Sequence, residues 1–165
     1  MDSNIYKTPI GNILISSDKE AITTLKLVGA SIARPPMDGL DPSAVEASHH
    51  PTTLTDLAAK QLLEYLDGKR QEFTIPLAPK GTVFQQAVWD ALLSIPYGET
   101  RSYKQVAQMI NNPKAVRAVG MANNKNPIWI IIPCHRVIGS NGKLVGYGGG
   151  LDIKEKLLLL EKSHY

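Results

Sequence analysis

The chain of 165 residues has room for one ordinary domain or two small ones, and its composition, 43% hydrophobic and 20% charged, is typical of a soluble globular protein. Its single cysteine excludes an internal disulfide and any zinc or iron–sulfur site that needs several thiolates. The net charge of +3 is unevenly divided, because residues 1–78 carry 7 Lys and Arg against 10 Asp and Glu, and residues 79–165 carry 11 against 5. A basic second half favours a polyanionic partner, although a solvated surface fits charge alone equally well.

The first half of the chain predicts a small α/β domain over residues 1–78. Apolar residues near 13–15 and across 22–28 predict short strands separated by a polar turn. Residues 29–53 are rich in proline and predict a long irregular loop. Apolar residues then recur at helical spacing as far as Gly68, and a further alternation, ending at Leu77, predicts one more strand before a short linker.

Helix start signals divide the second domain, expected over residues 79–165, into short helices. Residues 82–85 (TVFQ) and 102–105 (SYKQ) both have capping-box spacing. The second box opens a helix that runs through Ile110, and Asn112-Pro113 then offers an N-cap followed by a proline at the first helical position. Two short helices joined by about three residues have the spacing of a helix-turn-helix unit.

The second helix of this pair, residues 114–122, carries two basic residues among mostly small or aliphatic ones. A helix that reads the major groove normally presents Asn, Gln or several Arg to the base edges. Its composition therefore favours docking by shape or from the minor groove. From the pattern alone, an amphipathic packing helix is the more ordinary interpretation.

Cys134 stands in the run IIIPCHRVI, at the end of an apolar stretch and beside two basic side chains. The thiolate is the nucleophilic form of cysteine, and neighbouring positive or proton-accepting groups raise its fraction. A buried cysteine that acts as a small hydrophobe is the commoner fate of a lone cysteine. Neighbouring residues of a regular strand point to opposite faces, so Cys134 and His135 cooperate only if the chain bends, and Pro133 favours such a break.

The run PCHRVI, preceded by Asn126-Pro127, resembles the O6-alkylguanine-DNA alkyltransferases, also called methylated-DNA–protein-cysteine methyltransferases. The resemblance covers residues 82–161, through Tyr103, Arg117 and the YGG run at 147–149, whereas residues 1–78 match only loosely. It implies a small α/β N-terminal domain followed by a mainly α C-terminal domain with a helix-turn-helix of winged-helix type. It also implies DNA repair by direct reversal, in which Cys134 irreversibly accepts the alkyl group of O6-alkylguanine, with O4-alkylthymine as a further candidate substrate. Each molecule then reacts once, and no cofactor is needed.

The resemblance implies a catalytic role for five side chains. His135 accepts the proton of the Cys134 thiol, and Glu161 orients His135. Tyr103 supplies a hydrogen-bond donor to the departing base, and Asn126 holds the turn around the nucleophile. Taken singly, Tyr103 also fits a packed aromatic side chain, and Glu161 a surface charge near a helix end.

Further residues are implied to meet the DNA and the flipped base. Arg117 is the finger that fills the space left when a nucleotide rotates out of the helix. The other residues implied at the DNA surface are Lys104, Lys114, Ala118, Gly120, Met121 and Lys125. The residues implied to line the base pocket are Val137, Tyr147, Gly148 and Gly149. Gly148 departs from members that have serine at this position, so only its backbone N–H is available to the base.

The expected partner is double-stranded DNA containing alkylated guanine, bound by a monomer. Some members of the family hold zinc in the N-terminal domain, but here that domain has no cysteine, and adjacent His49 and His50 suit tetrahedral geometry poorly, so we expect no metal. The N-terminus does not resemble a signal peptide, and no apolar run is long enough to cross a bilayer. We expect a cytoplasmic protein without membrane contact, associated with the nucleoid in a bacterium or with the nucleus in a eukaryote.

Three other functions are weighed against this one. A protein that recognises alkylated bases without reacting would lack the nucleophile, so Cys134 counts against it. A helix-turn-helix transcription regulator would carry more base-reading side chains in its second helix. A cysteine hydrolase would need an oxyanion hole and a separately placed histidine, and no motif for either is present.

Overall fold

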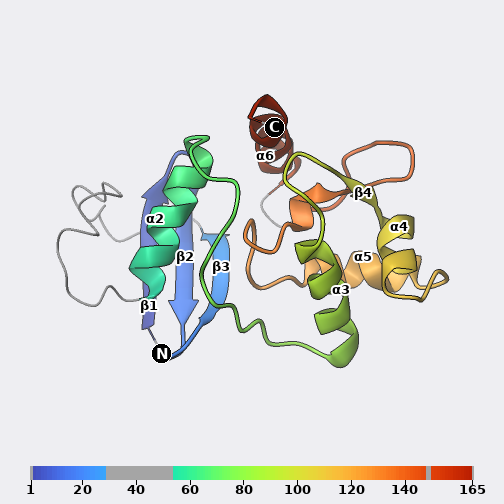
Figure 1. Cartoon of the computed structure of the whole chain (residues 1–165), viewed down its shortest axis with the longest axis horizontal. Coiled ribbons are helices and arrows are strands. Elements are labelled where there is room, and N and C mark those ends of the chain that lie inside the picture. The colour runs from blue at the N-terminus through green and yellow to red at the C-terminus, as the bar shows by residue number, and fades with distance from the viewer. Residues whose placement is uncertain (1, 29–53, 148–149, 165) are drawn as a thin grey trace. The chain divides into compact units, whose positions relative to one another are not determined.

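The computed structural model describes residues 2–28, 54–147 and 150–164. The chain divides into two compact units, Met1–Pro79 and Lys80–Tyr165, one residue from the boundary expected from the sequence (Figure 1). No helix within the described ranges is long and apolar enough to cross a membrane. The expected loop at 29–53, which includes His49 and His50, lies outside the described residues, as do Gly148 and Gly149 of the expected base pocket.

The first unit is a three-stranded antiparallel sheet with one helix packed along one of its faces (Figure 1). Its elements are β1 (Asp2–Thr8), β2 (Gly11–Ser17), β3 (Ile22–Val28) and α2 (Leu54–Leu66). Alternate residues of β2, Ile13 and Ile15, are buried with Leu25 of β3 and Leu62 of α2. This apolar core confirms the predicted small α/β fold.

The structure differs from the sequence analysis of this unit in two places, one strand that was not located and one that was expected but does not form. Strand β1 was missed because its sequence, DSNIYKT, is mostly polar and Tyr6 is its only buried residue. The strand expected to end at Leu77 is reduced to an isolated parallel bridge with Ile22, in which the Ile22 N–H donates to the Pro76 carbonyl at 2.9 Å. Proline has no N–H to offer a sheet ladder, which explains why the pairing does not extend.

The second unit is mainly helical, as predicted. Its elements are α3 (Val83–Leu93), β4 (Arg101–Ser102), α4 (Tyr103–Met109), α5 (Val116–Asn124), the 3-10 turn η2 (Cys134–Arg136), β5 (Val137–Ile138) and α6 (Leu151–Ser163). Both predicted capping boxes form, and α3 and α4 begin directly after their N-cap residues, Thr82 and Ser102. Helices α3 and α4 pack on α5, where the Trp89 indole donates to the Ala122 carbonyl at 2.9 Å. Short parallel pairing of β4 with β5 places the nucleophile segment beside the start of α4.

The turn between α4 and α5 is longer than expected. Helix α5 begins at Val116 with Ala115 as its N-cap, so the prediction that Pro113 opens the helix was wrong. Asn112 instead accepts a backbone hydrogen bond from Ala115 at 3.0 Å, and Asn111 has a positive φ of 59°. Asparagine and proline favour turns as strongly as helix starts, which explains the error. The two helices pack as a helix-turn-helix pair, and the winged-helix type stays a prediction.

Candidate active site

Cys134 opens the one-turn helix η2, so the chain bends at the nucleophile instead of continuing as a strand. Pro133 precedes it with a φ of −81°. Buried Ile130, four residues before Cys134, has a φ of 72°, a left-handed conformation that β-branched residues rarely adopt. Such a residue costs on the order of 1–3 kcal/mol and persists only where its surroundings hold it.

Asn126 bridges the segment that carries this strained residue. Its Nδ2 donates to the Ile132 carbonyl at 2.9 Å, and its Oδ1 accepts from the Ile128 N–H at 2.9 Å. Asn126 is almost fully buried, so these hydrogen bonds form away from water. The amide therefore ties both ends of the segment that leads to Cys134.

Cys134 is buried, with only 4% of its surface exposed. Burial raises the pKa of its thiol to about 11, although a hydrogen bond from Asn126 and the charge of Lys154 act in the opposite direction. The resting side chain is therefore the neutral thiol at physiological pH. A base must take its proton when the sulfur attacks.

His135 and Glu161 form a buried pair that can supply this base. Nε2 of His135 lies 2.6 Å from Oε2 of Glu161, and both side chains are at most 1% exposed. Burial lowers the pKa of His135 and outweighs the raising effect of Glu161, so the imidazole is neutral. An ionised carboxylate only accepts hydrogen bonds, so Nε2 carries the proton and Nδ1 is the nitrogen able to accept another.

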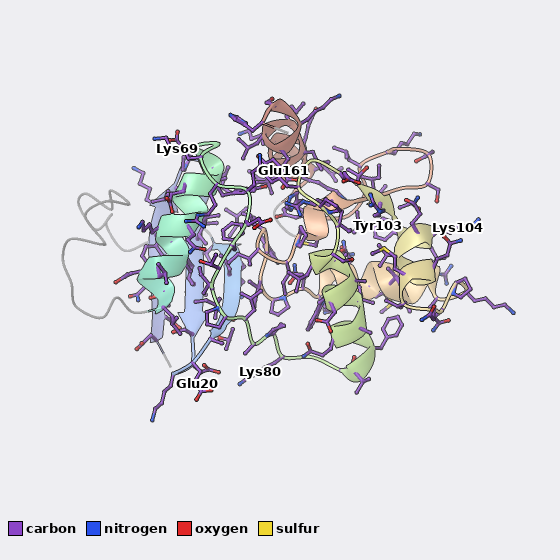
Figure 2. The ribbon with its side chains drawn as sticks, viewed as in Figure 1. Glu20, Lys69, Lys80, Tyr103, Lys104 and Glu161 are labelled. Atoms are coloured by element: carbon purple, nitrogen blue, oxygen red, sulfur yellow. The ribbon has the colours of Figure 1, made fainter. Side chains whose placement is uncertain are left out.

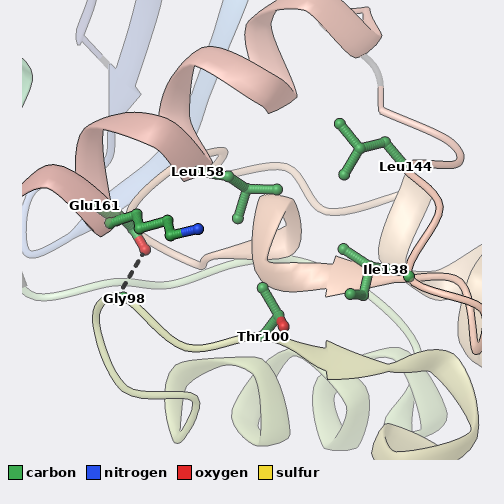
Figure 3. A pocket seen from close by; sticks show the side chains of 8 residues that line it. Gly98, Thr100, Ile138, Leu144, Leu158 and Glu161 are labelled. Carbon is green, nitrogen blue, oxygen red and sulfur yellow. Dashed lines mark hydrogen bonds between the residues drawn. The ribbon is translucent and has the colours of Figure 1, made fainter.

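Arg136 keeps Glu161 ionised. Its Nε donates to Oε1 of Glu161 at 2.8 Å and its Nη2 donates to Oε2 at 3.0 Å, while the Gly98 N–H donates to Oε1 at 3.2 Å (Figure 3). Burial would raise the pKa of Glu161, but hydrogen bonds and charge from His135 and Arg136 together hold it well below its ordinary value. Arg136 also donates to the Ile95 carbonyl at 2.7 Å, so it is committed to the interior.

Two tyrosines lie within electrostatic reach of Cys134. Tyr103 is the first residue of α4, and its hydroxyl donates to the Val145 carbonyl at 2.9 Å. The ring of Tyr147 lies 5.6 Å from that of Trp129, and its buried hydroxyl has no hydrogen-bond partner in the part of the chain that the structure describes. Burial, followed by the negative charge of Cys134, raises the pKa of both phenols, so both remain neutral donors. Val137, also expected in the base pocket, is fully buried in β5.

Two buried polar residues near Cys134 were missed by the sequence reasoning. Asn123 of α5 is 2% exposed, and its Nδ2 donates to the Cys134 carbonyl at 3.5 Å. Lys154 of α6 is fully buried and lies on the same helix face as Leu157 and Glu161. Its spacing from Glu161, seven residues along a helix, is a signal that the sequence contained.

The residues expected to meet DNA lie mostly on one outward face of α5 and its flanks. The exposed residues of this face, here called the candidate DNA-facing surface, are Lys114, Arg117, Ala118, Met121 and Lys125. Lys104 is exposed on the outer side of α4 (Figure 2). Gly120 is the exception, because a Cβ there would lie 3.8 Å from the ring of Tyr103.

A pocket of about 340 Å³ is lined in part by Glu161 (Figure 3). Its lining residues are Gly98, Thr100, Ile138, Gly142, Leu144, Leu158, Glu161 and Lys162. Neither Cys134 nor Tyr103 lines it, so it is not a pocket for a base that reacts with the sulfur. Within the described ranges, no group of three His, Cys, Asp or Glu side chains is arranged to hold a metal ion.

Both units match one family of proteins. Residues 83–163 match the 6-O-methylguanine DNA methyltransferase DNA binding domain, and residues 2–79 match the ribonuclease-like domain of the same proteins. A methylated-DNA–protein-cysteine methyltransferase of Methanosarcina acetivorans is 52% identical over 159 residues, which cover 96% of this chain and 97% of the relative. The corresponding protein of Mycobacterium tuberculosis is 46% identical over 161 residues, which cover 96% of this chain and 92% of the relative.

Solved structures agree with this assignment. The crystal structure of Mycobacterium tuberculosis O6-methylguanine methyltransferase superposes with a TM-score of 0.81 at 43% identity, covering 99% of this chain and 93% of that one. A structure of the mycobacterial protein in complex with DNA superposes equally well, at 42% identity over 98% of this chain and 93% of that one. The chain therefore belongs to the 6-O-methylguanine DNA methyltransferase family.

Proposed function

We propose that this protein repairs alkylated guanine in double-stranded DNA by moving the alkyl group from O6 to Cys134. The observation that carries the proposal is the buried contact of 2.6 Å between His135 and Glu161, directly beside the sole cysteine. The same compact unit presents a basic, exposed helix face to a polyanion. One chain supplies both features, so the proposed active form is a monomer.

The reaction is an in-line displacement at the alkyl carbon. The Cys134 thiol gives its proton to Nδ1 of His135 through a bridging water, and Glu161 stabilises the imidazolium that forms. The sulfur forms a bond to the alkyl carbon while the carbon–O6 bond breaks and its electron pair passes to the purine. Tyr103 gives its phenolic proton to the departing guanine, which leaves as the neutral base, and the proton held by His135 passes through water to restore the phenol and the neutral imidazole. No described side chain is placed to cleave the thioether product, so each molecule acts once.

The target atom lies inside the base stack, so the nucleotide must rotate out of the duplex. Unstacking costs a few kcal/mol, and Arg117 is exposed on α5, where it can occupy the vacated space. Small Ala118 next to it allows close approach to the groove. Lys104, Lys114 and Lys125 surround this face and contact phosphates, which makes binding depend on salt.

Substrate binding requires a rearrangement at Tyr103. In this structure its hydroxyl donates to the Val145 carbonyl, so it must exchange this bond for one to the base. The hydroxyl has a single proton to donate. The segment around Val145 therefore shifts, or Tyr103 turns, when a base enters.

The experiment that tests the proposal is mass spectrometry of the intact protein after incubation with duplex DNA containing O6-methylguanine. We expect one added methyl group, located on the Cys134 peptide, and restored guanine in the DNA. The single cysteine makes the assignment unambiguous. Tight binding to the damaged duplex without a change in mass would overturn the proposal and indicate a protein that only recognises alkylated bases.

A further inference from the structure

Helix α5 buries one polar side chain next to the nucleophile. Its buried residues are Val119, Ala122 and Asn123, and Asn123 is the only polar one among them. With 2% of its surface exposed, Asn123 has no access to bulk water for the hydrogen bonds of its amide. The relay that removes the thiol proton does not use this amide, so its burial needs an explanation of its own.

The amide of Asn123 is only half satisfied. Its Nδ2 donates to the Cys134 carbonyl at 3.5 Å, and its Oδ1 is buried without a hydrogen-bond partner among the described residues. A carbonyl oxygen can only accept, so the nitrogen must be the atom that faces Cys134, and Oδ1 is left as the unpaired acceptor. Buried polar atoms are nearly always paired, so an unpaired acceptor at this place indicates a donor that arrives from outside.

The unpaired acceptor lies beside the side chain that is proposed to meet the base. Gly120, one turn before Asn123 on α5, lies against Tyr103, since a Cβ there would be 3.8 Å from the ring. Residues three apart on a helix share a face, so Asn123 faces Tyr103 as well. The pKa of Tyr103 agrees with this placement, because burial and the charge of Cys134 raise it while a hydrogen bond from Asn123 acts in the opposite direction. The amide, the phenol and the nucleophile therefore converge on one place.

An O6-alkylguanine base can offer this acceptor only one kind of donor. Alkylation at O6 removes the proton from N1, and N9 carries the sugar, so the remaining N–H groups are those of the 2-amino group. This group lies next to N3, an acceptor, on the edge of guanine that faces the minor groove. A hydroxyl that donates and an amide oxygen that accepts are complementary to that edge.

We propose that Asn123 is a specificity-determining residue, whose Oδ1 accepts a hydrogen bond from the 2-amino group of the flipped base while Tyr103 donates to the same base. The inference rests on the proposed function, in which an alkylated guanine enters the site. O4-alkylthymine has no N–H donor, because alkylation at O4 removes the proton from N3 and N1 carries the sugar. It leaves Oδ1 unpaired, so the site favours guanine over thymine.

The test compares two duplexes that differ only in the 2-amino group. One contains O6-methylguanine and the other O6-methylhypoxanthine, and intact mass gives the single-turnover rate of methyl transfer to Cys134. Loss of the amino group should slow the wild type by about tenfold, the effect of one well-placed hydrogen bond. In Asn123→Leu, where an apolar group of similar size replaces the amide, the ratio between the two rates should fall by about tenfold.

Asn124→Leu is the matched control, because Asn124 is the next residue of α5 and is exposed. It should keep the wild-type ratio between the two duplexes. Differences in duplex stability cancel, since every protein meets the same pair of substrates.

An unchanged ratio in Asn123→Leu, whether both rates fall equally or neither changes, would overturn the proposal and leave the amide a supporting role only. A wild type that reacts equally fast with both duplexes would also overturn it. If Asn123→Leu does not fold, Asn123→Ala makes the same comparison, since it removes the acceptor and adds no volume. A wild type that gains no methyl group from either duplex would contradict the proposed function, and this inference with it.

Discussion

The two units bury polar side chains in different ways. In the first unit Gln61 of α2 and Thr74 exchange two neutral hydrogen bonds, at 2.7 and 3.0 Å. In the second unit the buried carboxylate of Glu161 lies between His135 and Arg136, each within 3.0 Å. One arrangement joins a helix to a loop, and the other surrounds a nucleophile.

This difference shows where the molecule gives up stability for chemistry. A neutral buried hydrogen bond contributes about 1 kcal/mol net. Buried charges lose hydration that their mutual attraction often fails to recover, so apolar replacements are frequently as stable or more stable. The second unit nevertheless buries Glu161 and Lys154 while leaving Leu159 exposed. In the proposed mechanism, the relay of His135 and Glu161 is the reason to keep that carboxylate buried.

The largest effect should come from Cys134→Ala. We expect no detectable alkyl transfer, because no other thiol exists in the chain, together with unchanged affinity for damaged duplex. Mass spectrometry measures the transfer, and fluorescence anisotropy with labelled duplex measures the binding. A folded variant that no longer bound DNA would contradict the separation between the nucleophile and the candidate DNA-facing surface.

Glu161→Gln should destabilise the protein by about 3–5 kcal/mol, because it leaves the buried Arg136 guanidinium without its counter-charge. Glu155→Gln, at an exposed position of the same helix, is the control and should change stability by less than about 0.5 kcal/mol. In the first unit, Gln61→Leu should cost about 1–3 kcal/mol by leaving Thr74 unsatisfied, without slowing the reaction with O6-benzylguanine. Urea denaturation measures the free energy of unfolding of the three variants. Equal losses of stability in Glu161→Gln and Gln61→Leu would contradict the difference between the two units.

Arg117→Ala should slow repair of duplex DNA by about tenfold or more, since losing 1.4 kcal/mol of the energy that supports the flipped state corresponds to a factor of ten. Reaction with free O6-benzylguanine needs no flipping and should keep its rate. Single-turnover rates on the two substrates give the comparison. Equal slowing on both would place Arg117 in the chemistry at Cys134 and not in the DNA contact.

Acidification should destabilise the protein in two steps, the smallest effects expected. Burial keeps the pKa of His135 below its ordinary value, so below about pH 6.5 the unfolded chain binds a proton that the folded chain does not. The pKa of Glu161 is also depressed, so a second loss begins below about pH 4.3. Thermal denaturation across this range should show both steps, and Glu161→Gln should lack the second. A wild-type midpoint that stays constant from neutral pH to about pH 5 would argue against a neutral His135.

Much of the second unit was predictable because its signals are local. A hydroxyl and an amide three residues apart specify where α3 and α4 begin, whatever else the chain does. The start of α5 was mispredicted because Asn112-Pro113 is as suitable for a turn as for a helix start. Strand β1 was not predicted because an edge strand with one buried side chain shows little alternation of apolar and polar residues.

The sequence by itself determined the nucleophile, since the chain has one cysteine, and the run PCHRVI identified its family. Only the tertiary structure decided which charges are buried around it. Arg136 meets Glu161 across 25 positions of the chain, and Lys154 meets Val137 across 17. Whether a charged side chain stays in water or enters the interior depends on partners that folding brings close, and no local pattern encodes that choice.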